Sequence, residues 1–329
     1  MIDIRHLGAA LDYTEKDFDV ALVRTHAPTL TSETLREAQV DLAHVERITT
    51  IRRLTTSGVT SLNSSSRFAS DGNSGFQVLW EDGERVFCRG NSHGDDTTLV
   101  LAVLPASEHP RPATLDRLAH EYGLKEELDG AWAVRPLELI REGGRTMLVL
   151  EDPGGEPLER LLGVAFEMDL FLRLAIDISV AVGRLHRRGL LHKDIKPANI
   201  IVNCADRQVR LTGFGIASRV PRERQAPEPP ETIAGTLAYM APEQTGRMNR
   251  SIDSRSDLYA LGVTFYQMLT GSLPFTAADP MEWVHCHIAR KPLPPSERSR
   301  NIPAPVSEIV MKLLEDRRGT LPDGRWRRE

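Results

Sequence analysis

The chain has 329 residues, of which 40% are hydrophobic and 26% charged, which is enough for one large or two modest globular domains with buried cores. Its net charge of −5 gives no overall basic field, so the composition argues against nucleic acid as a partner. The three cysteines Cys88, Cys204 and Cys286 lie far apart and cannot close an even disulfide framework, which favours a reducing cytoplasm.

The first 56 residues predict a helical segment, and residues 57–75 predict a flexible linker. Acidic residues near the N-terminus stand where a secretion signal needs an apolar core, so no export signal is expected. Apolar side chains recur at spacings of three and four from Leu35, which is typical of an amphipathic helix, and residues 35–54 are a candidate element for self-association. The linker is rich in Ser, Gly and Asn and has little to bury.

From Phe76 onward the pattern predicts a folded α+β domain. The runs FQVLW, RVFC, TLVLAVL and RTMLVL are expected to be strands, with a helix near residues 113–128. A longer helix is expected over 171–189, ending at Gly189, and it precedes a hairpin-like pair, IIVN and VRLTG. A small β-rich part joined to a larger helical part places a cleft between two lobes.

The remainder of the chain is a Pro-rich segment at 220–231 followed by helices from about residue 241. The uncharged stretch 258–278 is long enough to span a bilayer, but glycines, a glutamine and a proline interrupt it. We therefore expect a buried helix followed by a loop, and no membrane partner.

Several motifs follow in order: LLHKDIKPANIIV, then GFG, then GTLAYMAPEQ and DLYALG. Together they resemble the eukaryotic-type Ser/Thr protein kinase family over residues 76–316, leaving 317–329 as a basic tail. The run at 192–199 matches the HRDxKxxN catalytic loop, 213–215 stands at the DFG place, and 241–243 matches APE. The resemblance implies a bilobal fold with a small β-rich N-lobe and a larger helical C-lobe, truncated at its C-terminus.

The resemblance also implies roles for the residues that match. Asp194 would accept the substrate hydroxyl proton, Lys196 would contact the γ-phosphoryl oxygens, and Asn199 would bind a magnesium ion. Leu150 and Glu151 fall in the hinge that binds adenine. The implied cofactors are ATP and magnesium if the domain is active, and none otherwise.

Further matches concern the activation segment and its support. Thr236 matches the threonine that marks Ser/Thr specificity, and Asp257 matches the buried aspartate that holds the catalytic-loop backbone. Glu243 is the APE glutamate, whose usual arginine partner lies beyond the end of the match. Arg317 or Arg318 are the alternatives for that partner, but both fit solvated positions, so an unpaired buried carboxylate is expected.

Departures from the family pattern fall on the nucleotide side. The phosphate-binding glycine loop is reduced to EDGER with the single Gly83, and Ala102 stands where the ATP-binding lysine belongs. Without that lysine, Glu121 is expected to be an exposed helix carboxylate. Pro153 at the hinge has no N–H to offer adenine. Gly213 removes the carboxylate that chelates magnesium in this family, and a glycine there fits a backbone turn.

These losses favour a Ser/Thr protein kinase-like signalling domain with a degraded ATP and magnesium site, acting through protein partners as a pseudokinase or weakly active kinase. The alternative is an active Ser/Thr kinase with an atypical nucleotide site, and a small-molecule phosphotransferase fits YMAPEQ less well. The stretch 235–275 is similar to the N-terminal kinase module of large bacterial or fungal hybrid sensor histidine kinases. Residues 1–54 similarly resemble a PAS tail and the start of a histidine-kinase dimerisation helix, which suggests two-component signalling.

Overall fold

The computed structural model describes residues 76–92, 95–142, 144–203, 208–219, 236–247 and 251–315. The helical segment and linker expected over 1–75, the Pro-rich segment and the basic tail with Arg317 and Arg318 lie outside the described residues. Within the described residues, no helix is both long and apolar enough to cross a bilayer.

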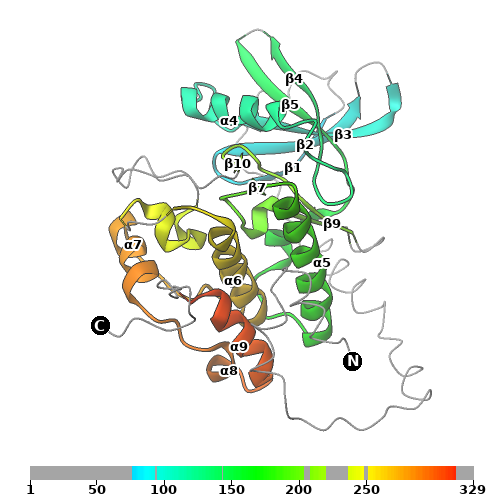
Figure 1. The fold of residues 1–329 in the computed structure, drawn as a ribbon. Helices are drawn as coiled ribbons and strands as arrows, with labels where there is room; N and C mark the ends of the chain where they lie inside the picture. The colour runs from blue at the N-terminus through cyan, green and yellow to red at the C-terminus, as the bar shows by residue number, and fades with distance from the viewer. Residues whose placement is uncertain are drawn as a thin grey trace, which may run out of the picture. The chain divides into compact units, whose positions relative to one another are not determined.

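A five-stranded antiparallel sheet and one helix form the N-terminal lobe (Figure 1). The strand order is β1-β2-β3-β5-β4, and the helix α4 lies beside the sheet. Their bounds are Gln77–Glu81 for β1, Arg85–Ser92 for β2, Asp95–Pro105 for β3, Pro112–Gly123 for α4, Pro136–Glu142 for β4 and Arg145–Glu151 for β5. The four strands expected from the sequence are confirmed, and β4 joins them at the sheet edge.

The expected helix near 113–128 is too long, because α4 ends at Gly123. Glycine is a poor helix former, and the chain then turns so that Leu124 and Leu128 enter the core of the second lobe. The apolar spacing that suggested a longer helix therefore belongs to a turn that joins the two lobes.

The register of β3 decides which of its side chains face α4. Leu101 pairs with Leu150 and Val103 pairs with Leu148, and all four share one buried cluster with Leu118 of α4. Because side chains alternate along a strand, the intervening residue 102 lies on the opposite face.

The C-terminal lobe is mainly helical, as expected (Figure 1). Its helices are α5, Met168–Arg187; α6, Ser254–Thr270; α7, Pro280–Ala289; α8, Pro295–Arg298; and α9, Ala304–Leu313. Short strands lie between α5 and α6: β7, Leu190–Leu191; β8, Ile200–Asn203; β9, Gln208–Leu211; and β10, Ser218–Arg219. β8 and β9 form the expected antiparallel pair, and β6, Glu156–Pro157, adds to β8.

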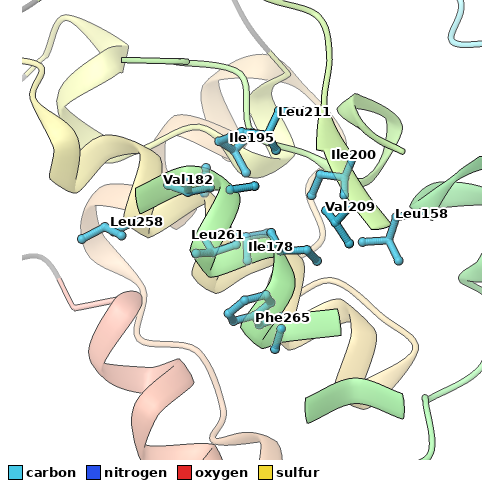
Figure 2. Close-up of a cluster of buried hydrophobic side chains, with 14 of the residues drawn as sticks. Leu158, Ile178, Val182, Ile195, Ile200, Val209, Leu211, Leu258, Leu261 and Phe265 are labelled. Carbon is cyan, nitrogen blue, oxygen red and sulfur yellow. The ribbon is translucent and has the colours of Figure 1, made fainter. Parts of the chain in front are cut away.

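The core of this lobe lies between α5 and α6 (Figure 2). Ile178 and Val182 of α5 meet Leu261 and Phe265 of α6, and all four side chains are essentially inaccessible to solvent. Helix α6 is buried around nearly its whole circumference and ends at Thr270 with Gly271 as its C-cap, which confirms the expected buried helix followed by a loop. Helix α6 supports the loop between β7 and β8, where the catalytic-loop motif lies, through the hydrogen bonds that Asp257 accepts.

Candidate functional site

Asp257 of α6 fixes the backbone of the loop that follows β7. Its carboxylate accepts hydrogen bonds from the backbone N–H groups of His192 at 2.9 Å and Lys193 at 2.8 Å, and Nε2 of His186 lies 2.8 Å away. Burial alone would raise the pKa of Asp257, but the contacts with His186 and His192 outweigh burial and hold it below its usual range. The anchored backbone includes Lys193 at φ 67°, a left-handed conformation that is uncommon outside glycine.

His192 is a structural residue of the same loop. Its Nδ1 accepts from the backbone N–H of Asp194 at 3.3 Å, and its Nε2 lies 3.0 Å from the carbonyl oxygen of Thr212. This pattern is that of a neutral imidazole, and burial lowers the pKa of His192, which keeps it neutral. The ring packs against Phe214 with centroids 4.7 Å apart. The loop and the GFG segment are therefore held together.

The residues predicted to face the substrate converge. Nζ of Lys196 lies 3.2 Å from Asp194 Oδ2 and donates to Oγ1 of Thr236 at 2.6 Å. The backbone N–H of Thr236 donates to Asp194 Oδ1 at 3.1 Å. Nδ2 of Asn199 donates to the Asp194 carbonyl oxygen at 2.8 Å and to its Oδ2 at 3.0 Å. A cation, an amide and a backbone N–H therefore surround the carboxylate of Asp194, the candidate general base.

The turn between β1 and β2 precedes a strand whose first residue contacts this site. It consists of Asp82, Gly83 and Glu84, and only Gly83, at φ 83°, adopts the left-handed conformation. Oδ1 of Asp82 accepts hydrogen bonds from the backbone N–H groups of Glu84 at 3.2 Å and Arg85 at 2.8 Å. The turn is thus closed on its own carboxylate instead of presenting its N–H groups to a ligand.

Arg85, the first residue of β2, reaches into the site. Its Nε donates to Asp82 Oδ2 at 2.9 Å, and its Nη2 contacts the same oxygen. Nη2 also donates to Oδ1 of Asn199 at 2.9 Å, which joins the two lobes through side chains. Sequence reasoning missed Arg85. The signal that could have found it is an arginine beside the shortened turn, one strand away from a lysine-free β3.

Glu121 of α4 is buried, which differs from the expectation based on the sequence. It was expected to be exposed, but it is 3% exposed and its Oε1 accepts a hydrogen bond from the backbone N–H of Gly213 at 3.0 Å. Burial raises the pKa of Glu121, while the charge of Arg85 opposes that rise. Arg85 thus supplies positive charge near a helix carboxylate that has no lysine on β3. Ala102 pairs with Cys88 and Val149 on the face away from α4.

Gly213 adopts φ 79°, and a Cβ added there would lie 2.5 Å from Asn199 Oδ1. A magnesium ion needs oxygen ligands in a near-octahedral arrangement. Here Gly213 offers no carboxylate, and Arg85 already occupies the amide oxygen of Asn199. The described residues also contain no group of three or more His, Cys, Asp or Glu side chains arranged to hold a metal. The residues of this site therefore do not fit the magnesium ion that the motifs imply.

The hinge after β5 is also tied into the protein. Leu150 is fully buried, and the backbone N–H of Glu151 donates to the carbonyl oxygen of Arg135 at 2.9 Å. Nε of Arg89 on β2 donates to Asp152 Oδ2 at 2.6 Å. Since Pro153 has no N–H, an adenine ring would find few backbone donors along residues 151–153.

Glu243, in the short helix η5 (Pro242–Thr245), accepts a side-chain hydrogen bond that the sequence did not predict, while the alternative partners Arg317 and Arg318 lie outside the described residues. Its Oε1 accepts from Oγ of Ser256 at 2.5 Å. Burial raises the pKa of Glu243, and the hydroxyl of Ser256 opposes that rise. A hydroxyl donor from α6 thus anchors the end of the activation segment.

The sequence matches the family model of the protein kinase domain over residues 94–322. It is 34% identical over 143 residues to serine/threonine-protein kinase PknB of Mycobacterium tuberculosis, covering 44% of this chain and 22% of that protein. It is 31% identical over 184 residues to a probable serine/threonine-protein kinase of Clostridium perfringens, covering 55% of this chain and 26% of that protein. The matched stretches thus span about a quarter of the length of these curated relatives.

Proposed function

The chain belongs to the protein kinase domain family, and we propose that it is a Ser/Thr protein kinase-like signalling domain whose nucleotide site is degraded and which acts by binding partner proteins. The observation that carries the proposal is the hydrogen bond from Arg85 Nη2 to Asn199 Oδ1. It places an internal cation on the amide oxygen that a metal ion would need.

Phosphoryl transfer depends on positioning and on neutralising the charge of the phosphates, with little covalent chemistry from the protein. The residues that position the substrate are retained, because Asp194, Lys196 and Thr236 lie in mutual contact. Two groups that neutralise the phosphate charge are not retained, because β3 has no lysine and Gly213 has no carboxylate. Loss of one such group typically costs about 100-fold in rate, and joint losses are large even when they do not add. Ordinary turnover is therefore not expected.

One observation favours the alternative of an active kinase with an atypical site. Arg85 donates a hydrogen bond to Asn199, and its positive charge opposes the rise in the pKa of Glu121, so a cation from another strand replaces one of the lost charges. Such an enzyme would still have to transfer phosphate without the carboxylate missing at Gly213. The proposed function is therefore partner binding, and weak kinase activity is the second candidate.

Partner binding in this proposal concerns proteins of a signalling pathway in the cytoplasm, and residues 35–54 supply a candidate self-association element. The similarity of residues 235–275 to kinase modules of hybrid sensor histidine kinases, and of residues 1–54 to their sensor parts, supports a link to two-component signalling. Size-exclusion chromatography with light scattering on the full chain and on a variant lacking 35–54 tests the self-association. A dimer that becomes a monomer when that segment is removed supports it, and the same oligomeric state in both chains contradicts it.

The site proposal is tested by the melting temperature of the full chain with ATP, in excess EDTA and in excess Mg²⁺. We expect no additional stabilisation from Mg²⁺, because no described set of ligands fits the ion. Asn199→Asp serves as the comparison, since it supplies a carboxylate at the same position. A Mg²⁺-dependent rise in the melting temperature of the unmodified chain, lost in Asn199→Ala, would contradict the proposal.

A further inference from the structure

The turn of the β1–β2 hairpin is attached to helix α4. Oε1 of Glu84 in the turn accepts a hydrogen bond from Nη2 of Arg111 at 3.1 Å, and its Oε2 accepts from Nη1 of Arg117 at 2.8 Å. Arg111 is the N-cap residue of α4, and Arg117 lies within the helix. The backbone carbonyl oxygen of Glu84 also accepts from the N–H of Ala106, just after β3, at 2.9 Å. One residue of the turn therefore holds the first half of α4.

The next residue of the turn is attached to the second lobe. Nη2 of Arg85 donates to Oδ1 of Asn199 at 2.9 Å, and its Nε donates to Oδ2 of Asp82 at 2.9 Å. Oδ1 of Asp82 accepts from the backbone N–H groups of both Glu84 and Arg85, so one carboxylate ties the two attachment residues together. Burial would raise the pKa of Asp82, but the charge and hydrogen bonds of Arg85 outweigh burial and lower that pKa, which keeps the pair ionised.

Two further arginines attach the strands of the hairpin. Nη1 of Arg160, in the short helix η1 (Leu158–Leu161), donates to the carbonyl oxygen of Leu79 on β1 at 2.9 Å. Nη2 of Arg89 on β2 donates to the carbonyl oxygen of Gly155 at 3.2 Å. These two partners flank β6, which pairs with β8 of the second lobe. The hairpin is therefore attached to the second lobe along its strands as well as at its turn.

The two attachments of the turn differ in their exposure to water. In the contact with α4, which we call the outer contact, the side chains of Glu84, Arg111 and Arg117 are 46%, 74% and 33% exposed. In the inner contact with Asn199, the Asp82 side chain is 6% exposed and the Arg85 side chain 15%. Salt screens exposed charges far more than buried ones. The outer contact should therefore weaken in salt, and the inner contact should persist.

We propose that the β1–β2 hairpin is a strap that holds α4 and the loop after β7 together without a bound nucleotide, through the outer contact to α4 and the inner contact to Asn199. The strap gives partner proteins a fixed arrangement of the two lobes to bind. This inference rests on the proposed function, because it takes the closure of the lobes to be independent of ATP.

The test is hydrogen exchange measured by mass spectrometry on the full chain without nucleotide, in peptides covering residues 77–92, 112–123 and 190–203. The double variant Asp82→Asn/Arg85→Gln breaks the inner contact without leaving one buried charge alone. We expect exchange to become about tenfold faster in 77–92 and in 190–203, because a hydrogen bond to a charged group is worth at least that much in local opening.

Glu84→Gln weakens the outer contact alone. We expect exchange to become about two- to threefold faster in 77–92 and 112–123 and to stay unchanged in 190–203, and high salt should have the same effect on the unmodified chain. Arg173→Ala, which removes a surface arginine of α5, is the control and should leave all three peptides unchanged.

Unchanged exchange in 190–203 of the double variant overturns the strap, because the hairpin would then be closed only on itself. If the double variant does not fold, Arg85→Lys decides in its place, since a single ammonium group lacks the fork that contacts Asp82 and Asn199 together. Faster exchange in 190–203 of Arg85→Lys supports the strap, and unchanged exchange overturns it. Slower exchange of the unmodified chain in excess ATP and Mg²⁺ contradicts the proposed function as well, whereas a negative result in the variants with no nucleotide effect overturns this inference alone.

Discussion

The backbone N–H of Gly213 donates a hydrogen bond to Oε1 of the buried Glu121 at 3.0 Å. The helix carboxylate that has lost its lysine partner thus holds the start of the GFG segment by its main chain. Glu121→Ala would leave a buried N–H without this acceptor, and we expect the free energy of unfolding to fall by about 2 kcal/mol. Glu121→Gln keeps an acceptor and should lose less. Urea denaturation measures both, and equal losses in the two variants would be inconsistent with this role.

Restoring aspartate at Gly213 is not expected to restore a magnesium site. A Cβ there would lie 2.5 Å from Asn199 Oδ1, and the residue has φ 79°. Gly213→Asp should therefore lower the free energy of unfolding by about 1–3 kcal/mol through strain and the displaced amide. Gly83→Asp is the matched control, because it has φ 83° but no atom within 4 Å of the added Cβ. A Gly213→Asp chain as stable as the control, with Mg²⁺-dependent stabilisation, would refute this reasoning.

Substitution of Asp257 should lower the free energy of unfolding far more than substitution of a surface carboxylate. Asp257→Asn replaces one acceptor oxygen with an NH₂ group that faces N–H donors, and we expect a loss of about 2–3 kcal/mol in the free energy of unfolding. Asp169→Asn on α5, whose side chain is 49% exposed and pairs with Arg173, should cost less than about 0.5 kcal/mol. Chemical denaturation of the two variants provides the comparison. Similar costs at both positions would contradict the anchoring role.

His287 of α7 should make the fold sensitive to acid. Burial lowers its pKa to about 4, while its contact with the Leu237 carbonyl oxygen opposes the shift. Its Nδ1 lies 2.8 Å from the Tyr259 hydroxyl and its Nε2 lies 2.8 Å from that carbonyl, which suits a neutral ring. An unfolded chain takes up the proton near pH 6.5, so between pH 6.5 and 4 the unfolded state binds more protons and stability falls as the pH is lowered.

The size of this effect is up to about 3 kcal/mol over the whole window, from about 1.4 kcal/mol for each pH unit. Denaturation midpoints at pH 7, 6 and 5 should fall in the unmodified chain and fall less in His287→Gln. Other titrating groups are common to both chains and cancel in the difference. Parallel pH profiles for the two chains would show that His287 does not carry the effect.

Much of the fold could be predicted from the sequence because its motifs occur in a fixed order and its strands and helices have clear periodicity. The buried helix α6 and the β8–β9 pair follow directly from apolar patterning and the glycine at 271. The end of α4 could not be placed, because Leu124 and Leu128 keep helical spacing while serving the core of the other lobe. Tertiary packing here overrides the local pattern.

The candidate site, like the fold, could be predicted only in part from the sequence. Asp194, Lys196 and Asn199 were predicted from one contiguous motif, and the structure brings them together. Arg85 and the burial of Glu121 were not predicted, because both depend on contacts between residues far apart in the chain. The absence of a lysine from β3 is visible in the sequence. The replacement of its charge by Arg85 of β2 depends on the direction of a side chain in three dimensions.

The most direct test of the proposed function is a phosphotransfer assay with labelled ATP and Mg²⁺, scoring autophosphorylation and transfer to a general Ser/Thr substrate. The full chain and its Asp194→Ala variant are compared at equal concentration beside an active Ser/Thr kinase. We predict that the two chains give the same background signal, within about twofold, because the β3 lysine and the carboxylate at position 213 are absent. Magnesium-dependent turnover that is well above background and lost in Asp194→Ala would show that the domain is an active kinase with an atypical site.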